Sequence, residues 1–469
     1  MFTQGARPRI LFCLAATIVV AAGALLFWRP HPSVRESSAE GTNKYLPDRA
    51  ELQVKPGEKA EAEALYLRAR ELETHESGQD TQAARDLYQD AIAIDPDFAL
   101  AHARLSMILS ATRVSPEENK RARSEAEGAL RLDPQLGEGH FALGVWLDEN
   151  GDAARAIAEI EIAARALPND SHIVYRAATL HRRAGKWKQS LEEFQKTVAL
   201  NPRNFLGPTD LAYHLSLMRD WGNAASAWDR ALAIVPESMF NRILRAYADV
   251  WATGDLSRGE ALLASTPADY AGQGKELLAW MRWDFGLLHR DFDAADAAVA
   301  AYKDDTISGG WFGPLPKAYM HACVKLAHSD SVAAMPLLAQ ACAFFEKQIK
   351  EHPDFPEGHS QLAVAYAYMG RKDEAVREGL RGAELCPESK DAYAGTRIST
   401  ALAVIYARTG ETDKAIAEVK RLLTVPGALG YECSITLNDL KLRWQWDPLR
   451  SDPRFQAIVN GPEPATVIR

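Results

Sequence analysis

The sequence predicts an all-α protein, an α-solenoid of helical pairs preceded by one transmembrane helix. Three observations lead to this prediction. Prolines recur at a fixed interval, because Pro134, Pro168, Pro202 and Pro236 are each 34 residues apart. Small and apolar residues recur at helical spacing between these prolines. Residues 10–28 are uncharged and apolar, and these 19 residues come close to the length of a helix that crosses a bilayer.

The amino-terminal run "ILFCLAATIVVAAGALLFW" is expected to be an uncleaved membrane anchor. Arg7 and Arg9 precede it, and Trp28 closes it ahead of Arg29, as an interfacial anchor would. A cleaved signal peptide is the alternative, but its apolar core is usually shorter and ends at a site with two small residues. Here the run ends in Leu-Leu-Phe-Trp-Arg-Pro, which favours the anchor.

The charges that flank this run favour one orientation in the membrane. Arg7, Arg9 and the amino terminus precede it, whereas the arginines that follow are offset by glutamates. We therefore expect a single-pass protein of the inner (cell) membrane, with residues 1–9 in the cytoplasm and the repeat domain outside it, in the periplasm if the source is bacterial. Residues 29–60 are polar and contain several Pro and Gly, so they are expected to form a flexible linker.

Composition and charge restrict the function. Hydrophobic residues make up 47% and charged residues 25%, a balance typical of a folded globular chain. The net charge is −9, so there is no basic excess that would neutralise phosphates. We therefore expect no nucleic-acid partner. Alanine is abundant and β-branched runs are scarce, which favours helices.

The same residue types stand at the same places in each period. In the unit 137–170, Gly144 on the first expected helix and Ala156 on the second let two helices approach closely. Between the helices, "ENGDA", "RDWGNA" and "MGRKDEA" supply turns in which Gly is expected to adopt the left-handed conformation. The small pairs of other units are Ala178 and Ser190 in 171–204, Ala212 and Ala224 in 205–238, and Ala363 and Ala375 in 356–389.

This pattern resembles the tetratricopeptide repeat family over roughly residues 61–427. The resemblance implies a solenoid over 61–436 with about ten helical pairs, each followed by a proline joint. The stretch 238–355 lacks the full residue set and is treated as degenerate. Within it, "TISGGWFGPLP" (306–316) is expected to bend or split the array, and "TRVSPEEN" (112–119) to form a longer turn inside its own pair.

In this family the first helix of each pair lines a concave groove that holds an extended or helical peptide. The resemblance therefore implies protein partners, and an aromatic, partly basic groove suits a hydrophobic peptide or an amphipathic helix. The Lys and Asn residues that clamp acidic tails in some members are absent at these positions. Some of the rings could instead belong to the core between repeats. The groove candidates are Phe141, Val145, Tyr175, Thr179, Arg182, Arg183, Thr209 and Tyr213.

No arrangement of residues typical of catalysis is present, so we expect no enzyme activity and no cofactor. His321 and His328 lie seven residues apart on one helical face, about 10 Å along the axis, which is too far for one metal ion. A packing or surface role is preferred for them and for Cys323. The spacing leaves open a disulfide between Cys323 and Cys342.

The carboxyl-terminal segment 437–469 departs from the 34-residue period. Its "WDPLRSDPRF" resembles the closing segment of tetratricopeptide regions in bacterial membrane-bound sensors, of which this chain would be the sensory half alone. We expect the segment to cap the array, because the last pair of a solenoid leaves an apolar face bare. The capping residues would be Leu440, Leu442, Trp444, Trp446, Leu449 and Phe455.

These observations favour a non-enzymatic, membrane-anchored scaffold or adaptor that binds segments of other proteins. A periplasmic chaperone-like assembly factor for exported proteins or cytochromes is the alternative, and it rests on the same layout. An enzyme with an unrecognised site in 239–355 is a third, less favoured hypothesis.

Overall fold

The computed structural model describes residues 58–73, 78–112, 115–307, 313–430 and 434–467. The expected cytoplasmic segment 1–9, the membrane anchor 10–28 and nearly all of the linker 29–60 lie outside these residues. Within the described part, no helix has both the length and the apolar character needed to span a membrane.

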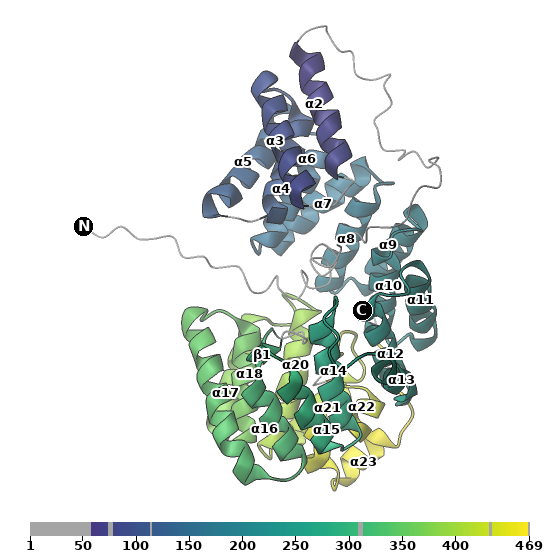
Figure 1. Cartoon of the computed structure of the whole chain (residues 1–469), viewed down its shortest axis with the longest axis vertical. Coiled ribbons are helices and arrows are strands. Elements are labelled where there is room, and N and C mark those ends of the chain that lie inside the picture. The colour runs from purple at the N-terminus through teal and green to yellow at the C-terminus, as the bar shows by residue number, and fades with distance from the viewer. Residues whose placement is uncertain (1–57, 74–77, 113–114, 308–312, 431–433, 468–469) are drawn as a thin grey trace, which may run out of the picture. The chain divides into compact units, whose positions relative to one another are not determined.

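The chain divides into two compact units, with the boundary between Leu180 and His181. The N-terminal unit is built from helical pairs, and Figure 1 labels them from α2 in purple onward. Its helices are α2 (Glu58–Glu73), α3 (Gly78–Ile94), α4 (Ala99–Thr112), α5 (Pro116–Leu132), α6 (Gly137–Glu149), α7 (Ala153–Ala166) and the greater part of α8 (Ser171–Arg183).

The C-terminal unit continues the same pattern through the stretch that the sequence marks as degenerate. The described residues of the two units together hold ten helical pairs, from α2–α3 to α20–α21. Helices α9 to α15 are Trp187–Leu200, Leu206–Leu217, Trp221–Ile234, Met239–Thr253, Ser257–Ser265, Lys275–Leu288 and Phe292–Ala301. Helices α16 to α21 are Lys317–Ala327, Ser331–Glu351, Pro356–Tyr368, Lys372–Leu385, Ala394–Arg408 and Thr412–Leu422. The prediction of an all-α repeat array is confirmed.

Two short strands interrupt the array where a breaker was expected. Strands β1 (Thr306–Ile307) and β2 (Leu315–Pro316) pair in antiparallel fashion, and Ile307 stands opposite Leu315. Both of these side chains are buried, so the hairpin packs inward. The array continues directly afterwards with α16.

Small residues bring the two helices of a pair together, as the sequence predicts. A Cβ atom at Gly144 on α6 would lie only 2.8 Å from the side chain of Ile160 on α7. Ala156 and Ala142 are fully buried at the same contact. Any larger residue at position 144 would therefore force the pair apart.

From α6–α7 to α20–α21, the turn inside a pair follows one scheme, with a left-handed residue ahead of the second helix. Gly151 and Gly370 have φ values of 82° and 75° in this place, as expected. The expectation for Gly222 was wrong, because this residue lies inside α11 and Arg219 takes the left-handed conformation instead, with φ of 62°. A side chain in this region costs backbone energy, so the residue must be held by other contacts.

A histidine bridge joins the helices at three of the proline joints. His140 on α6 lies 2.6 Å from Glu159 on α7 through Nδ1 and 3.1 Å from the Pro134 carbonyl through Nε2. The bridge recurs at His102 with Glu125 and Pro96, and at His359 with Glu378 and Pro353. A histidine donates from both ring nitrogens only when it is protonated. The hydrogen bond with Glu125 accordingly raises the pKa of His102, although burial opposes the shift.

The carboxyl-terminal segment folds as α22 (Leu437–Leu442), the 3-10 helix η1 (Trp444–Leu449) and α23 (Pro453–Val459). Five of the six expected capping residues are buried, and Leu442 is half-buried. The segment contacts α20 and α21, the last pair, and α22 also packs against α12. The contact with α12 is absent from the sequence-based expectation.

A buried ionic group fixes this segment to the middle of the C-terminal unit. The guanidinium of Arg443 donates to Asp284 on α14 at 2.7 Å and to Asp439 on α22 at 2.6 Å. All three side chains are at most 2% exposed. Tyr247 on α12 donates a further hydrogen bond to Asp284. Removal of the cation would leave two carboxylates without compensation in the interior.

We therefore expect Arg443→Leu to lower the free energy of unfolding by about 3–5 kcal/mol, measured by urea denaturation. The matched control is Arg454→Leu, because Arg454 forms an exposed pair with Asp413 at 2.7 Å. Loss of such a surface pair should cost less than about 1 kcal/mol. Equal, small losses in both variants would contradict the structural role assigned to Arg443.

Candidate functional site

The groove candidates of the N-terminal unit lie on the first helices of successive pairs. Phe141 and Val145 on α6 are half-buried and pack at the edge of a core cluster that includes Leu143 and Leu147. Tyr175 on α8 is also half-buried. These side chains therefore keep part of their apolar surface accessible. Thr179 differs, because it is buried and its hydroxyl donates to the Arg176 carbonyl at 2.8 Å.

Arg182, the first candidate within the C-terminal unit, is enclosed rather than open. Its side chain is 3% exposed and pairs with Asp210 on α10 at 3.3 Å. Its guanidinium also lies over the rings of Phe194, Tyr213 and Tyr393, at 5.2, 6.0 and 5.2 Å from their centroids. Cation–π contacts of this kind gain strength when water is excluded. Arg182 therefore holds α8, α9 and α10 against the residue that precedes α20.

The remaining candidates make contacts within the same interior. Arg183 donates to Asp391 at 2.7 Å, and its carbonyl accepts from the Ala392 amide at 2.7 Å. The hydroxyl of Tyr213, a residue only 1% exposed, lies 3.3 Å from that of Tyr393. Thr209 is buried and donates to Asn241 at 3.2 Å. A peptide reaches Arg183 and Tyr213 only after the contacts with residues 391–393 open.

These contacts belong to a larger closure that the sequence does not reveal. We define the closing segment as residues 391–430 and 434–463. Along it, the Gly427 amide donates to the Leu217 carbonyl of α10 at 3.1 Å, and Asn438 donates to the Trp251 carbonyl of α12 at 3.1 Å. With Arg443 on Asp284 of α14, the segment contacts the first helices of three successive pairs. The C-terminal unit thus covers these helices with its own chain.

Two arginines in left-handed turns anchor the closing segment. Arg219 donates to the Leu422 and Ile435 carbonyls at 3.1 and 2.7 Å and to Glu463 at 3.2 Å. Arg290, with φ of 58°, pairs with Asp447 at 3.0 Å. Most of the other turns have Gly in this place, and one has Ser329, so an arginine there was the available sequence signal. It is a weak signal, because the partners lie more than 150 residues further along the chain.

Burial also changes the charge of groups near the closure. Burial, helped by the nearby cation of Arg182, lowers the pKa of His214 on α10 to about 3, so this ring is neutral. Its Nε2 faces the Trp187 carbonyl at 3.0 Å and therefore carries the proton. Burial raises the pKa of Glu357 on α18 to about 7. Both pKa shifts therefore follow mainly from the removal of these side chains from water.

The two histidines considered as metal ligands, His321 and His328, each contact another side chain. Nδ1 of His321 lies 2.7 Å from Asp296, and the ring of His328 stacks on Phe292 at 4.8 Å between centroids. No group of three or more potential metal ligands occurs among the described residues. Cys323 and Cys342 are buried free thiols, so the disulfide left open by the spacing does not form.

The different burial of Tyr175 and Tyr213 predicts different effects on stability. Tyr213→Ala should lower the free energy of unfolding by about 3–5 kcal/mol, because it empties a fully enclosed site. Tyr175→Ala should cost on the order of 1 kcal/mol, because Tyr175 is only partly buried. Tyr213→Phe is the matched control, because it keeps the ring and removes the hydroxyl that lies near that of Tyr393. Similar losses for the two alanine variants, measured by urea denaturation, would contradict the assignment of Tyr213 to the interior.

No protein-family model matches the chain, and no curated protein matches its sequence. Solved structures to which it is similar include a thermophilic tetratricopeptide repeat protein of Thermus thermophilus, at 15% identity, with 40% of this chain and 98% of that chain covered and a TM-score of 0.34. PilW, a type IV pilus biogenesis factor, matches at 19% identity over 45% of this chain and 96% of that chain, with a TM-score of 0.39. YrrB, a tetratricopeptide repeat protein with an unusual peptide-binding site, matches at 19% identity over 38% and 89%, with a TM-score of 0.29.

The three TM-scores are low, and each match covers less than half of this chain. The described chain is a helical repeat array, and the solved structures named above to which it is similar include tetratricopeptide repeat proteins.

Proposed function

We propose that this protein is a non-enzymatic, membrane-anchored scaffold that binds an extended or helical segment of another protein on its N-terminal unit. The observation that supports this proposal is the partial exposure of Phe141, Val145 and Tyr175 along the first helices α6 and α8. Apolar rings that remain accessible at successive repeats are the kind of anchor that peptide grooves use.

The C-terminal unit supports the same argument in a different way. Thr209 and Tyr213 stand 34 residues after Tyr175 and Thr179 in the repeat, and there the chain covers the first helices with its own closing segment. The first-helix face can therefore hold a polypeptide segment through ring contacts and backbone hydrogen bonds. In the N-terminal unit we propose that a segment of a partner protein occupies the corresponding face of the first helices.

The partner face of the N-terminal unit also carries fixed polar groups. Arg176 on α8 pairs with Asp148 at 3.3 Å and with Glu149 at 3.6 Å, next to the half-buried rings. Asp148 is almost fully buried, so this pair is held in place. A mixed face of rings and compensated charges favours an amphipathic helix over a purely apolar or a strongly acidic ligand.

Site-specific photo-cross-linking in intact membranes tests the binding face. A photoreactive residue at position 145 or 175 should capture a partner, because both positions are partly exposed on the proposed face. The same residue at position 155 is the control, since Arg155 is 59% exposed on the second helix α7. Equal capture at 155, or no capture at 145 and 175, would refute the binding face.

The identity of the captured protein separates the two functional hypotheses. A resident envelope protein supports the scaffold. Newly exported chains or immature cytochromes support the periplasmic assembly factor, which uses the same face for a different class of partner.

The membrane anchor is part of this proposal and has its own test. We expect residues 10–28 to hold the repeat array outside the cytoplasm, because the arginines before this segment are not offset by acidic residues and those after it are. Two reporters are fused in turn after residue 57, directly ahead of α2. The reporter that is active only outside the cytoplasm should show activity, and the one that is active only inside it should not. Activity of a cytoplasm-dependent reporter at this position would reverse the orientation, and a soluble, processed product would replace the anchor by a cleaved signal peptide.

A further inference from the structure

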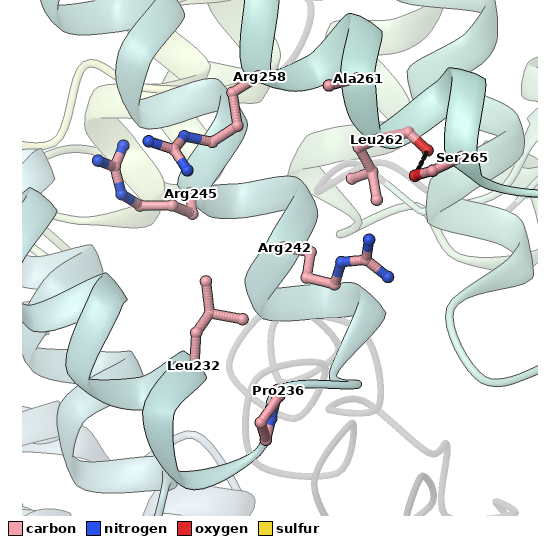
Figure 2. A pocket seen from close by; sticks show the side chains of 8 residues that line it. All are labelled: Leu232, Pro236, Arg242, Arg245, Arg258, Ala261, Leu262 and Ser265. Carbon is pink, nitrogen blue, oxygen red and sulfur yellow. Dashed lines mark hydrogen bonds between the residues drawn. The ribbon is translucent and has the colours of Figure 1, made fainter.

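A pocket lined by arginines lies between α11, α12 and α13 of the C-terminal unit. Its volume is 350 Å³, and Arg242, Arg245 and Arg258 contribute to its walls. Figure 2 shows the side chain of Arg242 extending toward Leu262 and Ser265 of α13. The pocket lies at a proline joint, since Pro236 forms part of it.

The position of Arg242 corresponds to that of the bridging histidines. His102, His140 and His359 each lie six residues after the proline whose carbonyl they contact. Arg242 lies six residues after Pro236. This repeat therefore has a permanently charged guanidinium where three others have an imidazole.

The carboxylate of the bridge is missing in this repeat. The partner of His140 and that of His359 lie 19 residues further along the chain. The residue 19 positions after Arg242 is Ala261, and the next is Leu262, which takes the place if the longer helix α12 shifts the register by one. Both residues line the pocket, and neither has a side-chain atom that could accept a hydrogen bond from Arg242. At this joint, Arg242 therefore provides a cation at the histidine position, and no carboxylate stands at the glutamate position.

The charges around the pocket leave one cation uncompensated. Arg245 pairs with Asp229 at 2.9 Å and with Asp249, and Arg258 pairs with Asp249 at 2.6 Å. Arg242 has no side-chain hydrogen bond or ion pair with any residue that the structure describes. The three guanidinium groups and the two carboxylates of Asp229 and Asp249 together have a net charge of +1. A monoanion satisfies this balance, whereas a dianion would meet repulsion from Asp249 and Asp229.

We infer that this pocket binds a carboxylate carried on a short aliphatic chain, with Arg242 as its ionic partner in place of the missing glutamate. Guanidinium and carboxylate form two parallel hydrogen bonds, and Leu232, Ala261 and Leu262 provide an apolar wall for the methylene groups. Such a carboxylate occurs on a glutamate side chain of a partner protein and on small organic acids. The inference does not depend on the partner face of the N-terminal unit.

Calorimetric titration of the full-length protein in detergent tests this inference. The probes are butyrate and the blocked peptide acetyl-Ala-Glu-Ala-amide, each with one carboxylate, and their amide counterparts butyramide and the glutamine peptide. We expect a dissociation constant of about 1 mM or lower for at least one carboxylate and none measurable for the amides. Binding of the peptide alone identifies a protein side chain as the source, and binding of butyrate alone identifies a small acid.

Two kinds of variant make the result specific to the pocket. Arg242→Gln should weaken binding at least tenfold, about 1.4 kcal/mol, whereas Arg230→Gln, an exposed arginine of α11 outside the pocket, should leave it unchanged. Ala261→Glu or Leu262→Glu should restore the bridge within the chain, raise the melting temperature and abolish probe binding. If Arg242→Gln does not fold, the loss of probe binding in Ala261→Glu and Leu262→Glu tests the inference instead.

Several results would overturn the inference. They are the absence of binding by both carboxylates, equal binding of the amides, unchanged affinity in Arg242→Gln, or tighter binding of inorganic phosphate than of either carboxylate.

Discussion

The constraint on which this structure depends is that a helical pair cannot bury its own apolar faces. Gly144 and Ala156 let two helices meet closely, but the outward stripes of each pair remain apolar and need a neighbour. Most pairs receive that neighbour from the next repeat. The last pair, α20–α21, receives it from α22, η1 and α23, and Trp444, Trp446 and Phe455 are buried as a result. Burial of such side chains contributes roughly 1.5–3 kcal/mol each before ordering costs, so the tail is integral to the fold.

The C-terminal unit meets this constraint in a second way, by covering the first helices of its own array. Arginines hold the closing segment against these helices, because a guanidinium can bridge carbonyls and carboxylates from several elements at once. Arg182, Arg219 and Arg443 are all nearly fully buried. Arg182 and Arg219 contact the closing segment, and Arg443, which belongs to that segment, contacts Asp284 of α14. Buried cations of this kind fix one arrangement, since their removal leaves carboxylates and carbonyls without partners. The partly exposed rings of α6 and α8 contrast with this enclosed face and are the better candidates for a partner protein.

The proline joints show how a repeat can carry function through a departure from its own pattern. Three joints use a histidine between a carbonyl and a glutamate, and the joint at Pro236 uses an arginine with no glutamate. At this joint the guanidinium of Arg242 lines a pocket and has no carboxylate at the corresponding position. Comparison between repeats of one chain therefore identifies a candidate ligand site without any comparison between proteins.

The sequence by itself determined the helical pairs, their period and their turns, because these depend on contacts between residues fewer than 34 positions apart. Apolar stripes and prolines therefore located the array, including the cap, while the weaker pattern of 238–355 concealed pairs that pack normally. Only the tertiary structure decided which first helices remain accessible. Tyr175 and Tyr213 both lie on the first helices of successive repeats, yet Tyr175 is only partly buried and Tyr213 lies against Tyr393, which is 180 residues away. No local pattern encodes that contact or the one between Arg183 and Asp391, since residues so far apart meet only when the helical pairs between them have packed.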